Sequence, residues 1–486
     1  MKEPTPAALE ESSPLSLDAG ALATAIHRRR WSCVEVTDAA LRRIGAVDGS
    51  LNAFCTLAAD AALAHAEALD ARLAANQPVG PLAGVPVAVK DLICTRGLRT
   101  TFGSRLYKTF VPDEDDVVVE RLRAAGAVVI GKTNTSEFGY GAVGHNPLFA
   151  TTRNPWNPSL TPGGSSAGSA VAVSARMVPL ALGSDGGGSV RIPASLTGVF
   201  GIKPSWGRVP VYPGCRDERY PGISSWESLE HIGPLTRHAA DAALALSVLT
   251  GPTPRDRHSL PVESTDWHIA PPSTLRGCRI AISTDMGHAV VDSEVRAAVE
   301  EAAQRLCGHI GAVVEHCHPV IGNTQPMFET LVALDTDRAG LKALARRRGV
   351  SLTGWLAQIV ERNWTGDEFS AALIERKRIA NLTWRFFERF DFLLTPTTAA
   401  AAFAADLAGP ERIDGRVVEP SAWIAFSALA NLTGLPAASV PIGFTADGRP
   451  IGLQIMGRHL DDRGVLALAS AVESLFPRDR WPCPAL

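Results

Sequence analysis

Long apolar runs and an excess of charge are missing from this chain of 486 residues, and we expect no leader sequence. No stretch approaches the roughly 18 consecutive apolar residues of a membrane helix. The N-terminus reads MKEPTPAALEESSPLS, which is acidic where a secretory signal is basic and has no apolar core. The 47 basic and 50 acidic residues leave a net charge of −3, which argues against nucleic-acid or membrane partners. These absences predict a cytoplasmic protein that acts on a small or uncharged molecule.

The eight cysteines are spread singly, and no Cys-x-x-Cys pair occurs. Isolated cysteines in a chain of this length are typical of reduced thiols rather than of a disulfide framework. The one cluster of metal-ligating residue types is His316-Cys317-His318. Because neighbouring residues of a strand point to opposite faces, these three side chains make a poor shared site. We therefore expect no bound metal.

From residue 84 onward, short apolar segments alternate with helical ones. The segments that predict strands are 85–90, 127–131, 179–183, 279–283, 392–395, 438–442 and 451–456. Between many of them, helices are predicted, for example over 117–125, 293–306 and 465–475. Residues 15–78 and 322–388 are predicted to be helical, and 204–230 to form a long irregular loop. This alternation indicates an α/β fold layered around one sheet.

One candidate for chemistry is the segment Gly84-Val85-Pro86-Val87-Ala88-Val89-Lys90-Asp91. As a strand, it places its three valines on one face and Lys90 on the other. A lysine that loses its hydration has a lowered pKa, so its neutral amine can act as a base. Taken alone, the segment is better explained by a lysine that reaches water from a strand end.

The segment Thr161-Pro162-Gly163-Gly164-Ser165-Ser166-Ala167-Gly168-Ser169-Ala170 is rich in glycine and serine. Its glycines supply backbone freedom at a turn, and its serines can cap a following helix. It also fits the Gly-x-Ser-x-Gly pattern with Ser166 as the serine, but that pattern requires a strand before it, and 154–163 is a predicted loop. Alone, a turn that caps a helix is the better interpretation.

A third segment reads Gly183-Ser184-Asp185-Gly186-Gly187-Gly188-Ser189-Val190-Arg191-Ile192-Pro193. Three glycines before a serine allow consecutive backbone N–H groups to converge on one point, as an oxyanion hole requires. Asp185 and Arg191 flank the turn and could brace it. Seen alone, a phosphate-binding or purely structural glycine turn explains the segment equally well.

Taken together and in this order, Lys90, Ser165 and Ser189 make the chain resemble the amidase signature family. The resemblance extends over roughly residues 15–480. Further segments resemble those of the family and occur in the same order along the chain. They are residues 131–134, 136–138, 153–156, 201–204, 207–209, 233–237, 432–437 and 448–454.

The resemblance implies that Ser189 is the nucleophile, that Ser165 on a cis peptide bond bridges to it, and that Lys90 is the terminal base. A serine is a weak nucleophile without an adjacent base, which a neutral lysine would supply through the bridging serine. The implied donors of the oxyanion hole are the backbone N–H groups of Gly186, Gly187, Gly188 and Ser189. The implied supporting residues are Ser166, Asp185 and Arg191. No metal or organic cofactor is implied.

The implied fold is a single amidase domain over residues 1–486, with a central mixed many-stranded β-sheet surrounded by α-helices. N-terminal helices would occupy 15–78, the signature core 80–240, and a helical insertion on the substrate side 320–390. We expect pocket residues within 138–149, 206–226 and 320–370. Two departures from the family pattern would reshape this pocket without removing a catalytic group: Ala167 replaces a usual glycine, and Ser184 and Gly186 replace a frequent threonine.

The implied activity is hydrolysis of a linear, non-peptide amide through an acyl-Ser189 intermediate. The predicted loop 204–230 is rich in proline and aromatic residues, which favours a neutral, apolar acyl or anilide group in the substrate, as in aryl acylamidases and urethanases. Carbamates and esters are alternative substrates. One alternative is a glutamine amidotransferase A-type subunit, which the missing Gly-x-Glu-x-x-Arg-Arg-Ile segment disfavours. Another is a catalytically silent amidase-like binding scaffold, against which the intact Lys90, Ser165 and Ser189 argue. We expect a small-molecule substrate, no nucleic-acid or membrane partner, and a monomer or homodimer.

Overall fold

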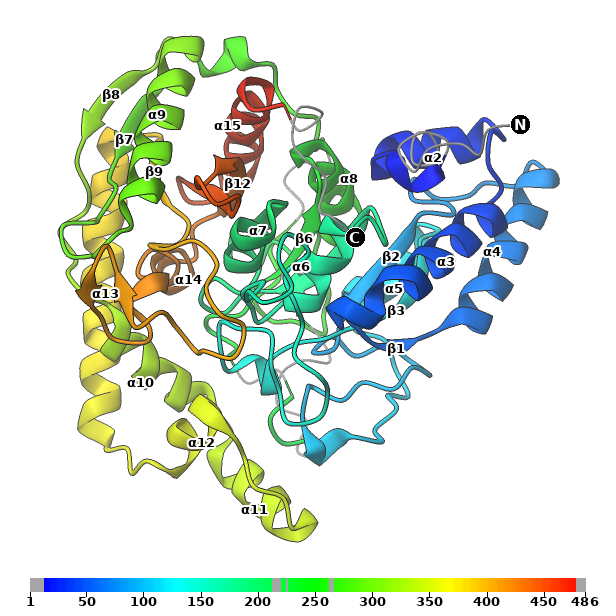
Figure 1. Ribbon diagram of the computed structural model, residues 1–486, viewed down its shortest axis with the longest axis horizontal. Helices are drawn as coiled ribbons and strands as arrows, with labels where there is room; N and C mark the ends of the chain where they lie inside the picture. The colour runs from blue at the N-terminus through cyan, green and yellow to red at the C-terminus, as the bar shows by residue number, and fades with distance from the viewer. Residues whose placement is uncertain (1–12, 212–219, 224–225, 262–265, 478–486) are drawn as a thin grey trace.

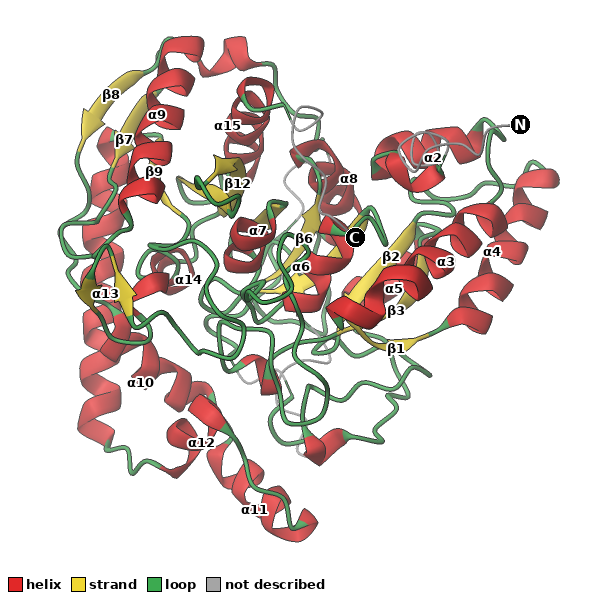
Figure 2. Cartoon of the chain, viewed as in Figure 1, coloured by secondary structure: helices red, strands yellow, loops and turns green. Residues whose placement is uncertain are grey.

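The computed structural model describes residues 13–211, 220–223, 226–261 and 266–477. This part of the chain contains an eleven-stranded sheet with parallel and antiparallel neighbours, and helices pack around it (Figures 1 and 2). The order across the sheet is β1 (Phe54–Leu57), β3 (Val128–Thr133), β2 (Pro86–Lys90), β4 (Leu180–Ser184), β6 (Ile232–Thr236), β5 (Phe200–Lys203), β12 (Ala437–Phe444), β13 (Pro450–Gly457), β9 (Phe392–Pro396), β7 (Arg279–Ile282) and β8 (Val313–His316). The predicted α/β class with a central mixed sheet is confirmed.

Three neighbouring strands, β3, β2 and β4, run parallel to one another. Every residue in them is buried, as expected for strands that are covered on both faces and rich in Val, Ile and Leu. In the register of β2 and β4, Val89 lies opposite Leu182. Because parallel strands run in the same direction, their last residues, Lys90 and Ser184, lie at the same end of the strands.

The N-terminal helices lie in the blue region of Figure 1, and the second and third of them contact β3. They are α2 (Ala19–His27), α3 (Cys33–Leu51) and α4 (Ala59–Ala74). A capping box formed by Ser32 and Glu35 begins α3, and Asn52 in the left-handed conformation ends it. The apolar faces of these helices share a core with β3 that includes Ile44, Leu69 and Val128.

The antiparallel part of the sheet is covered by helices from the second half of the chain. Contacts join α9 (Ser293–Ile310) and α15 (Asp462–Leu475) to β12 and β13, and α8 (Ala239–Leu249) to β5 and β6. An Asp292 side-chain cap begins α9, and Gly311 in the left-handed conformation ends it. These helices place a large apolar core on this side of the sheet.

Helices of the region 322–388 form an arm on the side of the molecule away from the N-terminal helices, with α11 and α12 at its lower end in Figure 1. The helices are α10 (Gln325–Asp335), α11 (Arg338–Arg348), α12 (Gly354–Glu361) and α13 (Gly366–Arg389). The predicted helical character of this region is confirmed. Among its contacts with the rest of the fold, α10 and α13 pack against α14 (Ala428–Thr433), and α11 contacts the short helix Arg105–Tyr107.

All seven predicted strands occur, with ends that differ by at most a few residues. In the eleven-stranded sheet, the sequence patterns missed β1, β5, β6 and β8, and they also missed the separate pair of short strands β10 (Arg412–Ile413) and β11 (Arg416–Val417). β1 interrupts the predicted N-terminal helices, and its pairing with β3 holds it as a strand. β6 contains Gly233 and Pro234, which weaken a strand pattern, yet it pairs on both sides. β8 is exposed along its length at the sheet edge, so it lacks the apolar pattern of a buried strand.

Within the described ranges, no helix combines the length and the apolar character that are required to cross a membrane.

Candidate active site

The end of β2 places Lys90 beside the end of β4. The Lys90 side chain is fully buried, and its Nζ atom donates to the Ser165 Oγ at 2.7 Å. It also donates to the Ser184 Oγ at 3.0 Å and to the Ser184 carbonyl at 3.1 Å. These three hydrogen bonds fix the position of the Lys90 amine beside Ser165.

Burial lowers the pKa of Lys90 to about 7, because the charged ammonium loses its hydration. The negative charges of Glu230 and Asp185 act in the opposite direction and raise this pKa. A substantial fraction of the Lys90 side chains is therefore neutral near pH 7, and a neutral amine can accept a proton from Ser165.

The Gly/Ser segment approaches Lys90 as a turn before α6 (Ala167–Ser174), as its composition predicts. The peptide bond between Gly164 and Ser165 is cis. The Ser165 side chain points to Lys90, whereas the Ser166 hydroxyl donates to the Ser184 carbonyl at 3.1 Å. Ser166 thus ties this turn to the end of β4 and supports the position of Ser165.

The glycine turn after β4 carries Ser189, which lines the same cavity as Ser165. The Ser166 amide donates to the Ser189 carbonyl at 3.1 Å, so the two turns are joined through the backbone. Between the two hydroxyls of Ser165 and Ser189, the structure shows no hydrogen bond among its described contacts. Such contacts are often longer in a protein without substrate and shorten when substrate binds.

The backbone N–H groups of the glycine turn are the possible donors of an oxyanion hole. The Gly188 N–H group donates to Asp185 Oδ1 at 2.7 Å, so it is already engaged inside the turn. The N–H groups of Gly186, Gly187 and Ser189 make no hydrogen bond with any described residue. The predicted set of four oxyanion donors therefore narrows to these three.

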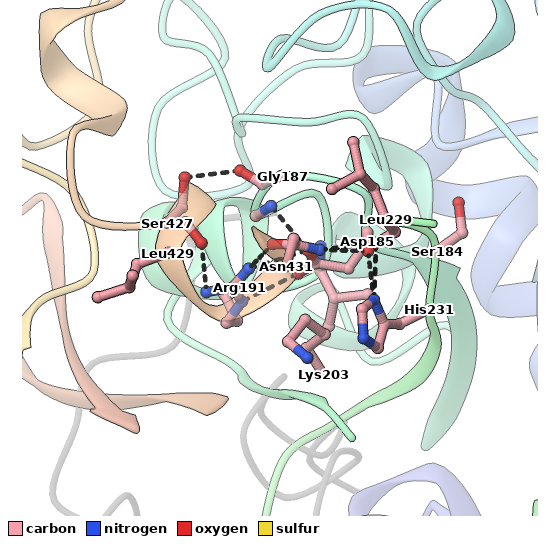
Figure 3. Close-up of polar contacts among 12 residues, drawn as sticks. Ser184, Asp185, Gly187, Arg191, Lys203, Leu229, His231, Ser427, Leu429 and Asn431 are labelled. Atoms are coloured by element: carbon pink, nitrogen blue, oxygen red, sulfur yellow. Dashed lines mark hydrogen bonds and ion pairs between the residues drawn. The ribbon is translucent and has the colours of Figure 1, made fainter. Parts of the chain in front are cut away.

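A fully buried ion pair between Arg191 and Asp185 braces this turn (Figure 3). The guanidinium donates twice to the Asp185 carboxylate, at 2.9 and 3.0 Å. Its other donors reach the Ser427 carbonyl, Gln454 and Asn431 at 2.7–2.9 Å. Although burial opposes ionisation, Arg191 holds the pKa of Asp185 below its usual range. Every guanidinium donor is satisfied, as a buried arginine requires.

Replacement of Arg191 by methionine is expected to lower the free energy of unfolding by about 3–5 kcal/mol, because Asp185 would remain as a buried charge without its partner. A urea titration followed by circular dichroism measures this loss. Arg42→Met is the matched control, because its ion pair with Asp38 is exposed, with 73% of the arginine side chain accessible. That change is expected to stay within about 0.5 kcal/mol. Equal unfolding midpoints for the two variants would contradict the bracing role.

The cavity over Ser165 and Ser189 has a volume of about 420 Å³, which includes space that is open to solvent. Its other lining residues are Leu92, Phe102, Phe138, Gly139, Ser184, Gly186, Gly222, Trp226 and Glu230. Two of the three ranges predicted to line the pocket, 138–149 and 206–226, contribute to it. No described residue of the range 320–370 lines it directly.

Aromatic rings from the helical arm support the cavity wall. The Trp226 ring contacts Tyr140 edge-on, with centroids 4.9 Å apart, and Trp355 at 5.9 Å. A Cβ atom on Gly186 would lie 2.2 Å from the Trp226 ring, and one on Gly187 would lie 2.5 Å from Phe328. Threonine is thus excluded at position 186, because the Trp226 ring occupies the space of its side chain.

Sequence reasoning missed Glu230, which lines the cavity, and the two residues Asn431 and Gln454, which hold Arg191. The polar side chains at 431 and 454 lie more than 200 positions from the glycine turn, so no local pattern connects them with it. In the described part of the chain, no group of three or more His, Cys, Asp or Glu side chains is placed to hold a metal ion.

Comparison with known proteins gives consistent matches along the chain. The profile of the family described as Amidase matches residues 35–466. The A subunit of glutamyl-tRNA(Gln) amidotransferase from Symbiobacterium thermophilum is 37% identical over 91% of this chain and 93% of its own. The structure of a bacterial aryl acylamidase of the amidase signature enzymes superimposes with a TM-score of 0.85 at 30% identity, over 95% of this chain and 96% of that one. The structure of the corresponding amidotransferase A subunit from Thermotoga maritima gives 0.74 at 30% identity, over 93% and 96%.

Proposed function

The chain belongs to the amidase signature family, and from this premise we propose that it hydrolyses amide-type C–N bonds with Ser189 as its nucleophile. The observation that carries the proposal is the 2.7 Å contact between the buried Lys90 amine and the Ser165 hydroxyl, in the wall of a cavity that Ser189 also lines. A base and a bridging hydroxyl beside a nucleophilic serine are what acyl transfer requires.

In the proposed reaction, the Ser189 Oγ attacks the amide carbonyl carbon and transfers its proton to Ser165. Ser165 at the same time gives its own proton to neutral Lys90. The negative charge that develops on the carbonyl oxygen is stabilised by the N–H groups of Gly186, Gly187 and Ser189. The C–N bond then breaks, and the proton returns through Ser165 to the leaving nitrogen. Attack of water on the acyl-Ser189 ester completes the hydrolysis and regenerates the serine.

The cavity supports a neutral, apolar acyl or aryl group as the preferred substrate. Its walls contain Leu92, Phe102, Phe138 and Trp226, and none of its described lining residues carries a positive charge. Aromatic walls of this kind bind apolar groups by burial of their surface. We therefore propose an amidase of the aryl acylamidase or urethanase type, with anilides, aryl carbamates and esters as candidate substrates.

A second candidate is an A-type amidotransferase subunit that releases ammonia from glutamine for a partner protein. The 37% identity to such a protein over 91% of this chain favours it. Against it, the described cavity lining offers no cation to pair with the α-carboxylate of glutamine. A catalytically silent binding scaffold is the third candidate, and the contact between Lys90 and Ser165 argues against it.

A substrate panel separates these candidates. The purified chain is assayed with an acyl anilide, an aryl carbamate, an aryl ester, a primary amide and glutamine. We expect kcat/KM for the anilide or carbamate to exceed that for glutamine by at least about 100-fold, since an unpaired buried carboxylate costs several kcal/mol. Preferential release of ammonia from glutamine would support the amidotransferase instead, and no turnover of any member would support the scaffold.

Replacement of Trp226 by alanine is expected to lower kcat/KM for a small anilide by about 10–100-fold, because the substrate loses an aromatic wall. The same change is expected to improve the relative rate with bulkier aryl groups, since the cavity widens beside Gly186. The control is Trp384→Ala, because this indole is 49% exposed on α13. An unchanged preference among aryl substrates after Trp226→Ala would remove this residue from the pocket.

We also infer a cytoplasmic location. The inference is supported by the cysteines of the described residues, which are all free: Cys33, Cys55, Cys94, Cys278, Cys307 and Cys317. Free thiols are typical of a reducing compartment.

A further inference from the structure

The helical arm contributes no described residue to the lining of the cavity, yet two of its helices bind the loop that carries Trp226. The contacts meet at Ser228, two residues after Trp226. The Ser228 N–H group and hydroxyl both donate to one carboxylate oxygen of Asp335, at 3.0 and 2.8 Å. Because Asp335 is the last residue of α10, this pair of hydrogen bonds joins the loop to the arm.

Arg376 on α13 binds the remaining polar groups of Ser228. Its Nη1 atom donates to the Ser228 hydroxyl at 2.9 Å, and its Nη2 atom donates to the Ser228 carbonyl at 2.7 Å. A hydroxyl can donate one hydrogen bond and accept two, so the Ser228 hydroxyl serves Asp335 and Arg376 at once. The N–H, O–H and C=O groups of Ser228 are therefore all bound to the arm.

The third contact of Arg376 connects the loop with the glycine turn. Its Nε atom donates to the Leu432 carbonyl of α14 at 2.8 Å. The preceding residue of α14, Asn431, donates to Asp185 Oδ1 at 3.0 Å and to the Leu229 carbonyl at 3.1 Å. Since the donors of a guanidinium have fixed directions in one plane, Arg376 sets the position of the loop relative to α14 and the glycine turn.

Within the loop, little backbone freedom separates Ser228 from Trp226. The Leu229 and Glu230 amides both donate to the Trp226 carbonyl, at 2.9 and 2.7 Å. The buried indole N–H group of Trp226 has no hydrogen-bond partner among the described residues, and the ring lies directly against Gly186. The position of the ring is therefore set by its packing and by the backbone that Ser228 anchors.

We propose that Arg376 is a positioning residue: through Ser228 it holds the Trp226 ring in the cavity wall, and it thereby determines which aryl groups the cavity accepts. This inference rests on the proposed function. Because Arg376 lies outside the described lining of the cavity, it acts on the preference between substrates through Trp226 and not by contact with them.

A purely structural role of Arg376 leads to a different result. If its loss only reduced the amount of folded protein, the rates with all substrates would fall by the same factor. A displaced Trp226 ring instead changes the rates with small and large aryl groups by different factors, since the ring limits the space beside Gly186. The ratio of two rates on the same preparation is independent of the folded fraction and therefore separates the two roles.

The test is the ratio of kcat/KM for a small anilide to kcat/KM for the naphthylamide of the same acyl group. In Arg376→Met this ratio should fall by about 10-fold or more, because a displacement of about 1 Å at a substrate contact can change a rate by about 100-fold. Arg378→Met is the matched control and should keep the wild-type ratio. Arg378 lies on the same helix, where its side chain pairs with Glu375 on the exposed face.

A double variant shows whether Arg376 acts through Trp226. Two residues that act through the same contact are not additive in their effects. When Arg376→Met is combined with Trp226→Ala, the ratio should therefore stay within about twofold of the ratio for Trp226→Ala alone. A further fall as large as in the wild-type background would show that Arg376 acts on another part of the pocket, and it would overturn the inference.

Ser228→Ala is the second route to the same answer. It removes the hydroxyl that Asp335 and Arg376 share and leaves the backbone contacts of this residue in place. The ratio should fall in the same direction as in Arg376→Met, by a smaller factor. This variant decides the question if Arg376→Met loses its fold by circular dichroism, and an unchanged ratio would then contradict the inference.

The outcomes distinguish the inference from the proposed function. If the wild type hydrolyses both aryl amides but Arg376→Met keeps the wild-type ratio, the inference falls while the proposed function stands. If the wild type hydrolyses neither aryl amide, the proposed substrate class falls and the inference with it.

Discussion

Ser189→Ala is expected to reduce kcat by about 10⁴-fold or more and to leave the fold intact. The effect is large because the acyl-enzyme intermediate can no longer form. In a serine hydrolase, removal of the nucleophile alone lowers kcat about as much as removal of all the catalytic residues. Because Ser189 is small and lies in the cavity wall with 9% of its surface exposed, alanine fits its place without a new cavity. The measurements are steady-state turnover of an anilide and the mass of the protein after fluorophosphonate treatment.

Three comparisons make this result specific to Ser189. The wild type should gain a single adduct on Ser189, and Ser189→Ala should gain none. Ser165→Ala should label slowly, because the proton path to Lys90 is interrupted. Ser247→Ala, at an exposed position of α8, should label at the wild-type rate. An adduct that forms equally in Ser189→Ala would place the nucleophile elsewhere.

Lys90→Met is expected to reduce kcat by about 10²–10⁴-fold, which is the usual contribution of a general base. It should also remove the pH dependence that this base imposes. The pKa of Lys90 is lowered to about 7, so below this pH the amine is protonated and cannot accept the Ser165 proton. The wild-type rate should therefore fall about tenfold per pH unit well below pH 7 and level off above it. The residual rate of Lys90→Met should lack this fall.

Lys132→Met is the matched control for this prediction. Lys132 is also a fully buried lysine, and it lies on the neighbouring strand β3, where its amine donates to Thr95 at 2.9 Å and to the Ile93 carbonyl. Its loss is expected to lower stability but to retain the fall in rate below pH 7. If Lys90→Met kept the wild-type pH profile, another group would be the base.

Much of the fold could be predicted from the sequence, because buried parallel strands require nearly continuous apolar runs. Val85–Lys90 and Pro179–Gly183 carry such runs, and both occur as strands with ends within one residue of the prediction. β8 and β1 could not be predicted in this way. The first is exposed at the sheet edge, and the second is a four-residue strand that depends on its pairing with β3.

For the site, the order and spacing of Lys90, Ser165 and Ser189 were sufficient to predict the family and the proposed roles. Residue types that carry the chemistry are visible in a sequence, since a base, a hydroxyl and a glycine turn each have their own composition. The contacts that set their properties are not visible there. Three such contacts depend on how the chain packs in space. Lys90 is buried at the end of its strand, the Gly188 amide is bound to Asp185, and Trp226 approaches Gly186.

The sequence by itself determined the α/β class, the family and the residues proposed for the chemistry, because local patterns and residue identity carry that information. Only the tertiary structure decided which backbone donors of the described turn remain free, which aromatic rings form the cavity wall, and that Glu230 lines the cavity. Desolvation and charge depend on all neighbours in space, whatever their distance along the chain. The charge state of Lys90 is therefore a property of the packed protein.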